Sequence, residues 1–279
     1  MIYDEILQDS DFQKLYDKLV LSYGLKTIDN NYIADADVID LIKYADLLSK
    51  STGPNLEYNK TLAQDIVFGL TFLFPDNKKI KYFAASILSS VGNYIGRNKI
   101  DDNFTFENPL DNFMDKLSME YLAVPNEEDT YFFSSQKLIY DKLDSNCFSY
   151  SGRTSLGKSF IIFSFIKDKI LSNSNCNFAI VVPSKALINQ NNIDLIAKLN
   201  NLLTEKNYRI IVSGNSVLLQ NDKNFIFVFT PERLLYLLSQ HPEIKIDYLF
   251  IDEAHKISEE DDRCIFYYPS LKLIIYQIL

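Results

Sequence analysis

Two observations predict an α/β protein in which a helical N-terminal domain, residues 1–130, precedes a domain with a parallel sheet, residues 131–279. Apolar residues recur at helical spacing in the first part, whereas short apolar runs alternate with helical patterns in the second. The charge changes at the same place. Residues 1–130 carry 12 Lys and Arg against 22 Asp and Glu, a net −10, and residues 131–279 carry 16 against 15, a net +1. This difference favours two domains and leaves the second able to present a local basic groove.

The helices of the first domain are predicted from apolar spacing and from residues that begin or end a helix. Asp35 is the candidate N-cap of the first of these helices. Pro75 ends the second, the third runs up to Gly96, and Pro125 follows the fourth. The predicted helices span residues 35–51, 61–74, 78–96 and 109–124. The acidic segment 125–136 is the predicted boundary between the domains.

The second domain is predicted to be a parallel sheet because its strands are short, rich in β-branched and aromatic residues, and separated by helical patterns. The predicted strands span residues 146–151, 177–183, 208–214, 224–230 and 247–252, and the predicted helices span 157–171, 184–203 and 231–240. Ligands of such sheets bind at the carboxyl ends of the strands. Functional residues are therefore expected directly after the strands.

The composition excludes several classes of protein. The longest apolar runs, such as residues 66–74, fall short of the roughly 18 residues of a membrane span, and the N-terminus lacks the basic start of a signal peptide. We therefore expect a cytoplasmic protein outside the membrane. Cys147, Cys176 and Cys264 lack the paired spacing of a zinc site or a disulfide framework, so we predict reduced thiols in the core.

The stretch GRTSLGKS, residues 152–159, matches the phosphate-loop pattern G-x-x-x-x-G-K-[ST]. Glycines let backbone N–H groups turn toward phosphate oxygens, and the N-terminus of the following helix adds positive potential. Lys158 is suited to the β- and γ-phosphates, and the hydroxyl of Ser159 is suited to Mg²⁺. The residues predicted to hold the nucleotide are Gly152, Arg153, Thr154, Ser155, Leu156, Gly157, Lys158 and Ser159.

A pair of carboxylates supplies the second half of this predicted site. Asp252 and Glu253 follow four apolar residues at the end of a predicted strand. Asp252 would hold Mg²⁺ through its water shell, and Glu253 would orient the attacking water and accept its proton. Acidic residues after a strand can also be solvated turn residues. The phosphate loop upstream in the same α/β pattern favours the catalytic interpretation.

Together these segments resemble the DEAD/DEAH-box helicases of superfamily 2. The letters DEAH stand at residues 252–255, after an apolar strand and after the phosphate loop. The segments AIVVPSKALINQ (179–190) and VFTPERLLYLL (228–238) are similar to motifs Ia and Ib of that family. The resemblance covers about residues 136–263. It implies a RecA-like P-loop domain that binds and hydrolyses ATP with Mg²⁺ and acts on DNA or RNA.

The resemblance also implies roles for further residues. Motifs Ia and Ib grip the sugar-phosphate backbone of one strand, for which helix N-termini, hydroxyls and a nearby cation are suited. Each segment taken alone could equally be an ordinary turn from a strand to a helix. His255 would act in catalysis by coupling the γ-phosphate state to the neighbouring domain, and Gln136 would either read adenine or be a surface glutamine. The residues predicted to contact nucleic acid are Pro183, Ser184, Lys185, Thr230, Pro231, Glu232 and Arg233.

The chain departs from the family after the DEAH letters. Family members close the ATP site with a second RecA-like domain that carries an arginine finger, which contributes about 10³–10⁵ in rate, and they couple through an S-A-T-type segment. Neither follows before Leu279, and the first sheet is expected to be a strand or more short. We therefore expect either the N-terminal piece of a longer helicase or a remnant that binds nucleotide without efficient hydrolysis. Arg153 is expected to point to solvent or to the missing domain.

The leading hypothesis is thus an ATP-dependent helicase or translocase, weak or inactive as this chain alone. The alternative is a non-motor ATP switch, whose acidic helical domain would dock a protein partner. The segments TSLGKSF and FIDEAHKISEEDDR are also reminiscent of helicases of bacterial antiviral defence.

Overall fold

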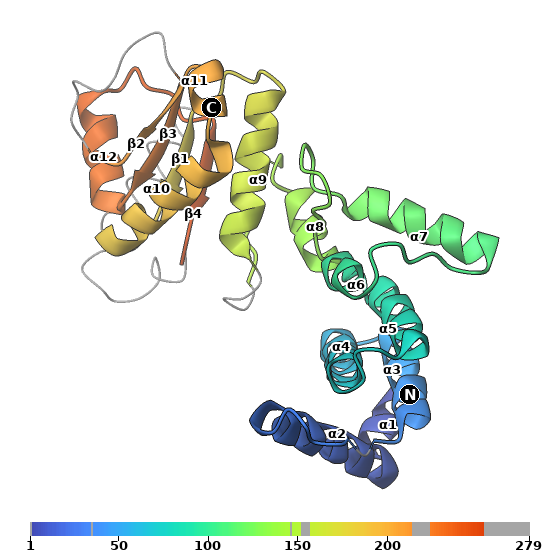
Figure 1. Cartoon of the computed structure of the whole chain (residues 1–279). Helices are drawn as coiled ribbons and strands as arrows, with labels where there is room; N and C mark the ends of the chain where they lie inside the picture. Colours follow the sequence, from blue (N-terminus) through green and yellow to red (C-terminus); the bar gives the residue numbers. More distant parts are fainter. Residues whose placement is uncertain (1, 35, 146, 152–156, 214–223, 254–279) are drawn as a thin grey trace. The chain divides into compact units, whose positions relative to one another are not determined.

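The computed structural model describes residues 2–34, 36–145, 147–151, 157–213 and 224–253. The contacts between residues divide the chain into two compact units, Met1–Lys137 and Leu138–Leu279 (Figure 1). The first unit is helical and the second contains a sheet and helices, which confirms the predicted fold class. None of the helices in the described ranges combines the length and the hydropathy needed to cross a membrane.

The first unit is built from helices, and α1 to α5 contribute buried apolar side chains to a common core. The four central helices, α2 to α5, pack on one another through fully buried aliphatic side chains, among them Leu41, Leu48, Ile66, Leu70 and Leu88. The bounds are α1 Ile2–Gln8, α2 Ser10–Ile28, α3 Val38–Ser49, α4 Leu56–Leu73, α5 Lys78–Val91, α6 Tyr94–Ile100 and α7 Pro109–Leu122, and α8 Ser134–Tyr140 continues into the second unit. The helical spacing of the sequence therefore produced a packed core, as expected.

Three predicted helices in this unit have wrong bounds, and the one predicted at 61–74 begins at Leu56 instead. The predicted helix 78–96 is broken, because Gly92 ends α5 in the left-handed conformation with φ +78°. Asn93 then begins α6, and its side chain accepts a hydrogen bond of 2.9 Å from the N–H of Gly96. The helix predicted from Asp35 begins at Val38 with Asp37 at its N-cap, and Asp35 itself lies outside the described residues.

Replacing Gly92 with Ala is expected to destabilise the first unit by roughly 1–2 kcal/mol, because an L side chain disfavours a positive φ. A methyl group there would also lie 3.3 Å from the Cδ1 atom of Leu122. The free energy of unfolding in urea tests this. The matched control is Gly24→Ala, since that glycine lies inside α2 and a methyl group there meets nothing within 4 Å. Equal stability of the two variants would contradict the expectation.

The segment predicted as the domain boundary, residues 125–136, belongs to the first unit. A bridge between Ala123 and Tyr131 closes a turn, and Phe132 is fully buried. The N–H of Phe132 donates to the carbonyl of Leu122 at 2.7 Å. The predicted domain limits of 1–130 and 131–279 stay predictions.

The second unit contains a four-stranded sheet in which every pair is parallel, in the order β2-β3-β1-β4. Its strands are β1 Phe178–Val181, β2 Tyr208–Ile211, β3 Asn224–Phe229 and β4 Tyr248–Ile251. Its helices after α8 are α9 Lys158–Leu171, α10 Lys185–Leu199, α11 Leu202–Glu205 and α12 Pro231–Gln240. In the central register Val181 lies beside Phe229 on one side and beside Ile251 on the other. The carboxyl ends of three strands thus lie together.

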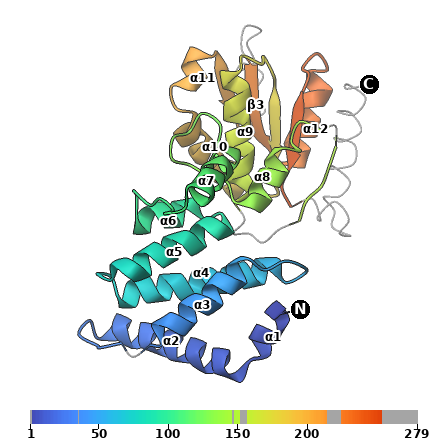
Figure 2. The ribbon, with the colours of Figure 1, turned by 90° about the vertical axis from the view of Figure 1, so that its right-hand side faces the viewer.

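Helices cover both faces of this sheet (Figure 2). On one face the rings of Phe227 and Phe229 pack in a core with Leu234 and Leu237 of α12. On the other face the ring of Phe165 in α9 makes edge contacts with rings of β4, at 5.1 Å from Tyr248 and 6.1 Å from Phe250. Burial on both faces explains why β1 and β3 read as continuous apolar runs.

Three predictions for the second unit need correction. Residues 147–151 form no strand, although a strand was predicted at 146–151; residue 146 lies outside the described residues. The predicted helix 184–203 is divided into α10 and α11 at Asn200, whose φ is +37°. Cys147 is exposed and is therefore no core thiol, while Cys176 is half-buried. Cys264 lies outside the described ranges.

Candidate functional site

The predicted phosphate loop is described only from Gly157 onward, and residues 152–156 lie outside the described part. Gly157 has a left-handed conformation, with φ +70°, and is the N-cap of α9. Lys158 is the first residue of that helix and Ser159 the second. Backbone N–H groups in the first turn of a helix have no partner within the helix. The start of α9 therefore combines donors, the helix dipole and a lysine, which suits an anion.

The direction of α9 brings its first turn toward the end of β4. Near the end of α9, Lys169 donates to Asp144 Oδ2 at 2.6 Å. Asp144 Oδ1 in turn accepts from the hydroxyl of Tyr248, the first residue of β4, at 2.7 Å. The end of α9 thus lies at the start of β4. Because α9 runs antiparallel to β4, Lys158 at the start of α9 lies toward the edge where β4 ends.

Asp252 and Glu253 follow β4 at that edge. The N–H of Asp252 donates to the carbonyl of Val181 at 2.9 Å, so Asp252 extends the β4 pairing with β1. Glu253 has φ +54°, a left-handed conformation that costs free energy in a residue other than glycine. Its N–H donates to Asp252 Oδ1 at 3.0 Å. The chain thus turns sharply at the two carboxylates and fixes the orientation of the first.

Tyr150 is a neighbour of Asp252 that sequence reasoning missed. Burial, and after it the negative charge of Asp252, raise the pKa of Tyr150, so this phenol stays neutral. Its ring stacks on that of Phe148, with 5.9 Å between the ring centres. Tyr150 precedes the phosphate loop by one residue, Ser151. Its place in the sequence was therefore the signal, since Tyr150 stands just before the predicted phosphate loop.

The predicted motif Ia residues lie where β1 leads into α10. Pro183 is buried, Ser184 is half-buried and Lys185 is exposed. Ser184 is the N-cap of α10, and its Oγ atom accepts a hydrogen bond of 3.3 Å from the N–H of Leu187. This cap explains why a serine begins the helix, and Lys185 places a cation in the first turn.

The predicted motif Ib residues lie beside them, where β3 leads into α12. The N–H of Val182 donates to the carbonyl of Phe229 at 2.9 Å, which connects the two strand ends. Thr230 is the N-cap of α12, Pro231 and Glu232 follow in its first turn, and Arg233 donates from Nη1 to the carbonyl of Val212 at 2.8 Å. Arg233 thus holds the start of α12 against the end of β2, a structural role that the sequence did not indicate.

The remaining predicted residues belong to the first unit or lie outside the described ranges. Gln136 belongs to the first unit and is buried, with an exposed fraction of 6%, so it is not a surface glutamine. Its Oε1 atom accepts a hydrogen bond of 2.8 Å from the N–H of Phe133. His255 lies outside the described residues, as do Gly152 to Leu156, Arg153 among them.

The sheet edge where β4 ends is suited to a cation that is held jointly by the protein and by phosphate groups. The described residues contain no group of three or more His, Cys, Asp and Glu that could hold a metal alone. Asp252 Oδ2 accepts no hydrogen bond from the described part of the chain, so one carboxylate oxygen is available. Mg²⁺ is commonly held by one or two protein groups together with phosphates of the nucleotide. A carboxylate, a hydroxyl at Ser159 and an anion-binding helix start fit that description.

The comparison with protein families agrees with this arrangement. The family model described as DEAD/DEAH box helicase matches residues 133–274, slightly more than half of the chain. No curated protein and no solved structure matches the chain.

Proposed function

Because the chain belongs to the DEAD/DEAH box helicase family, it is an ATPase-type enzyme with an ATP-dependent helicase-type function, and we propose that it hydrolyses Mg²⁺·ATP to act on single-stranded DNA or RNA. One observation carries this proposal. The backbone bonds from Asp252 to Val181 and from Val182 to Phe229 gather the two carboxylates and the two loops at one sheet edge. A nucleotide and a nucleic-acid strand bound at this edge would contact adjacent segments of the protein backbone.

In this proposal the residues around the nucleotide act by position and charge. The loop Gly152 to Ser159 cradles the phosphates, and Lys158 neutralises the β- and γ-phosphates. Ser159 and Asp252 hold Mg²⁺, which when bound neutralises charge that develops on the phosphates. Glu253 orients the attacking water and accepts its proton. Gln136 reads the adenine, and His255 couples the bound state to a neighbouring domain.

The two helix starts form the proposed strand contact. Ser184 and Thr230 begin α10 and α12, whose first-turn N–H groups are suited to phosphate oxygens. Lys185 is exposed in the first turn and adds a positive charge. Pro183, Pro231, Glu232 and Arg233 shape the same two turns. Contacts of this kind bind the backbone of the strand and carry no sequence preference.

The test is the rate of ATP hydrolysis with and without single-stranded DNA or RNA, in wild type and in two charge reversals. We expect strand to stimulate hydrolysis. Lys185→Glu is expected to raise the strand concentration for half-maximal stimulation by about tenfold at low salt, because a phosphate contact is lost. The control is Lys245→Glu. That exposed lysine precedes β4, and its carbonyl accepts a bond from Asn177, at the opposite edge of the sheet.

Each alternative gives a different result in this experiment. A rate of ATP hydrolysis that single-stranded DNA or RNA does not change would favour the non-motor switch, in which the acidic first unit docks a protein partner. ATP binding without hydrolysis would favour the inactive remnant. Equal effects of Lys185→Glu and Lys245→Glu would overturn the proposed strand contact.

A further inference from the structure

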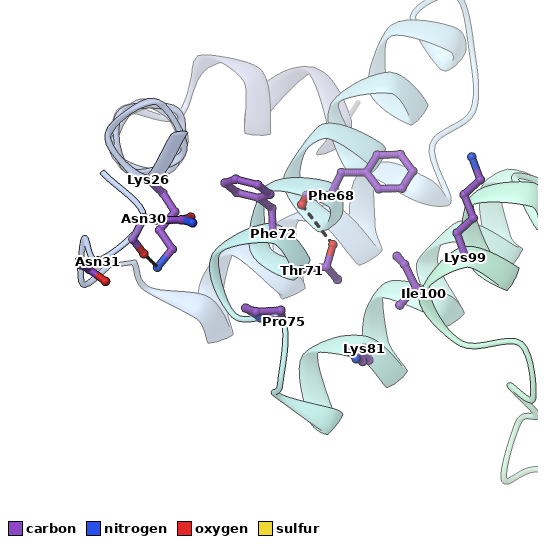
Figure 3. Close-up of a pocket in the computed structure, with 10 residues that line it drawn as sticks. All are labelled: Lys26, Asn30, Asn31, Phe68, Thr71, Phe72, Pro75, Lys81, Lys99 and Ile100. Carbon is purple, nitrogen blue, oxygen red and sulfur yellow. Dashed lines mark hydrogen bonds between the residues drawn. The ribbon is translucent and has the colours of Figure 1, made fainter. Parts of the chain in front are cut away.

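A pocket of about 720 Å³ lies within the first unit, between the end of α2, the outer face of α4, and helices α5 and α6 (Figure 3). Its lining holds aromatic rings, amides and lysines. The residues that line it are Lys26, Asn30, Asn31, Phe68, Thr71, Phe72, Pro75, Lys81, Lys99 and Ile100. The volume lies within the usual range of small-molecule sites.

Two aromatic rings form the wall that α4 contributes. Phe68 and Phe72 are four residues apart, so they lie on the same face of the helix, and Thr71 stands between them (Figure 3). Both rings are held in place. The ring of Phe72 lies 4.6 Å from that of Tyr23, and the ring of Phe68 packs against the backbone of Gly96. Both remain well exposed, at 39% and 41%. Fixed, exposed rings are suited to stacking against a flat partner.

Three lysines surround these rings. Lys26 donates to the carbonyls of Asn30 and Tyr32, at 2.7 and 3.2 Å, which are neutral acceptors and leave its charge uncompensated. The side-chain ammonium groups of Lys81 and Lys99 make no hydrogen bond or ion pair with the described part of the chain. Among the ten residues that line the pocket, none is acidic. The pocket therefore presents three positive charges beside two rings.

This charge is exceptional within its own unit. Residues 60–100 carry six Lys and Arg against two Asp and Glu, whereas the other residues of 1–130 carry six against twenty. The net negative charge of the unit repels polyanions. Attraction of a polyanion is therefore confined to the basic segment, which contains α5, α6 and most of α4. A surface in contact with solvent alone would not require basic residues to be concentrated in one segment.

We propose that this pocket binds one or two nucleotides of a single-stranded nucleic acid, with bases on Phe68 and Phe72 and phosphates on Lys26, Lys81 and Lys99. Aromatic platforms beside a track of cations are the chemistry by which proteins hold single strands. The amides of Asn30 and Asn31 stand at the rim and can bond to base edges. An acidic peptide would use the lysines but not the rings. The choice of a strand rests on the proposed function.

The charge test measures binding of fluorescent oligo(dT) and oligo(U) to the whole chain by anisotropy. The double variant Lys81→Glu/Lys99→Glu is expected to bind about tenfold more weakly at low salt. The salt dependence of binding should also lose roughly 1.4 in slope, about 0.7 for each phosphate contact. The matched control is Lys14→Glu/Lys43→Glu. It changes the net charge equally, and both lysines pair with acids on exposed helix turns outside the pocket.

The stacking test replaces a ring and keeps its apolar bulk. Phe72→Leu is expected to weaken binding at least about fivefold, because a stacked base is worth about 1–3 kcal/mol. Phe83→Leu is the control, since Phe83 is exposed at 46% on α5 and does not line the pocket. Photocrosslinking with a 5-bromouracil strand should join it to the peptide that contains Phe68 and Phe72.

The outcomes separate this proposal from the proposed function. If the strand stimulates hydrolysis but all pocket variants bind it like their controls, or crosslinks lie only elsewhere, the pocket proposal is overturned and the proposed function is unaffected. If the pocket variants lose strand binding while Lys185→Glu does not change the stimulation of hydrolysis, the pocket proposal is supported and the proposed strand contact at Lys185 is overturned. Stronger binding of free AMP or of polyglutamate than of the strand would overturn the commitment to a single strand.

Discussion

Replacing Glu253 with Gln is expected to slow ATP hydrolysis by about 10²–10⁴-fold and to leave ATP binding nearly unchanged. In the proposed mechanism Glu253 accepts the proton of the attacking water, and an amide cannot do so, whereas general-base catalysis is worth about that factor. Gln has the same shape and can keep the left-handed backbone at φ +54°. The N–H bond to Asp252 Oδ1 belongs to the backbone and survives the change. The loss should therefore be chemical rather than structural.

Single-turnover hydrolysis and nucleotide binding, measured separately, check this expectation. The matched comparison is Lys158→Ala, which removes the charge for the phosphates at the start of α9 and should weaken ATP binding as well as hydrolysis. Glu253→Gln should therefore accumulate bound ATP, whereas Lys158→Ala should not. Wild-type hydrolysis in Glu253→Gln would remove this residue from the mechanism. Loss of binding in both variants would indicate that Glu253 acts by shaping the site.

The sheet was predictable because its strands carry their own signal. Strands β1 and β3 are buried on both faces, so their residues read as unbroken apolar runs, and turn or helix signals follow them directly. Parallel pairing then fixes the rest. Once Val181, Phe229 and Ile251 end at one edge, the residues after them must lie together. The gathering of Asp252, Ser184 and Thr230 thus follows from topology.

The failures have equally specific causes. The apolar run at 147–151 predicts a strand, but a strand exists only where a partner offers hydrogen bonds, and no local pattern reports that. The break at Gly92 depends on a single left-handed residue inside an otherwise helical repeat. The bonds that Arg233 and Gln136 make to backbone groups of the protein were not anticipated either, and the ligand roles predicted for both residues stay predictions. The bond of Arg233 joins residues 21 apart, which no local pattern reports, whereas that of Gln136 joins residues three apart at the start of α8.

The pocket was missed for a related reason. Its lysines and rings come from α2, α4, α5 and α6, and each looks like an ordinary solvated or core residue in its own helix. Phe68 and Phe72 fit the apolar repeat of α4, so the repeat does not mark them as exposed. Only the packing of four helices shows that they face outward beside three cations (Figure 3).

Replacing Arg97 with Met is expected to destabilise the first unit by about 3–5 kcal/mol, because it leaves the buried carboxylate of Asp115 without its partner. The guanidinium Nη1 atom lies 2.8 Å from Asp115 Oδ2, and the two side chains are only 6% and 8% exposed. The same guanidinium lies 4.9 Å from the ring centre of Tyr94. Burial, and then the charge of Asp115, raise the pKa of Tyr94 to about 12, so the phenol stays neutral in this cluster.

Urea unfolding followed by far-ultraviolet circular dichroism measures the loss. The double variant Arg97→Met/Asp115→Leu should recover most of it, since both buried charges are then absent and the apolar side chains can pack between α6 and α7. Lys43→Met is the control. Its pair with Asp40 has the similar length of 2.9 Å but is more than half exposed, so its loss should cost less than about 1 kcal/mol. A cost for Arg97→Met no larger than that of Lys43→Met would show that the ion pair does not stabilise the helical unit.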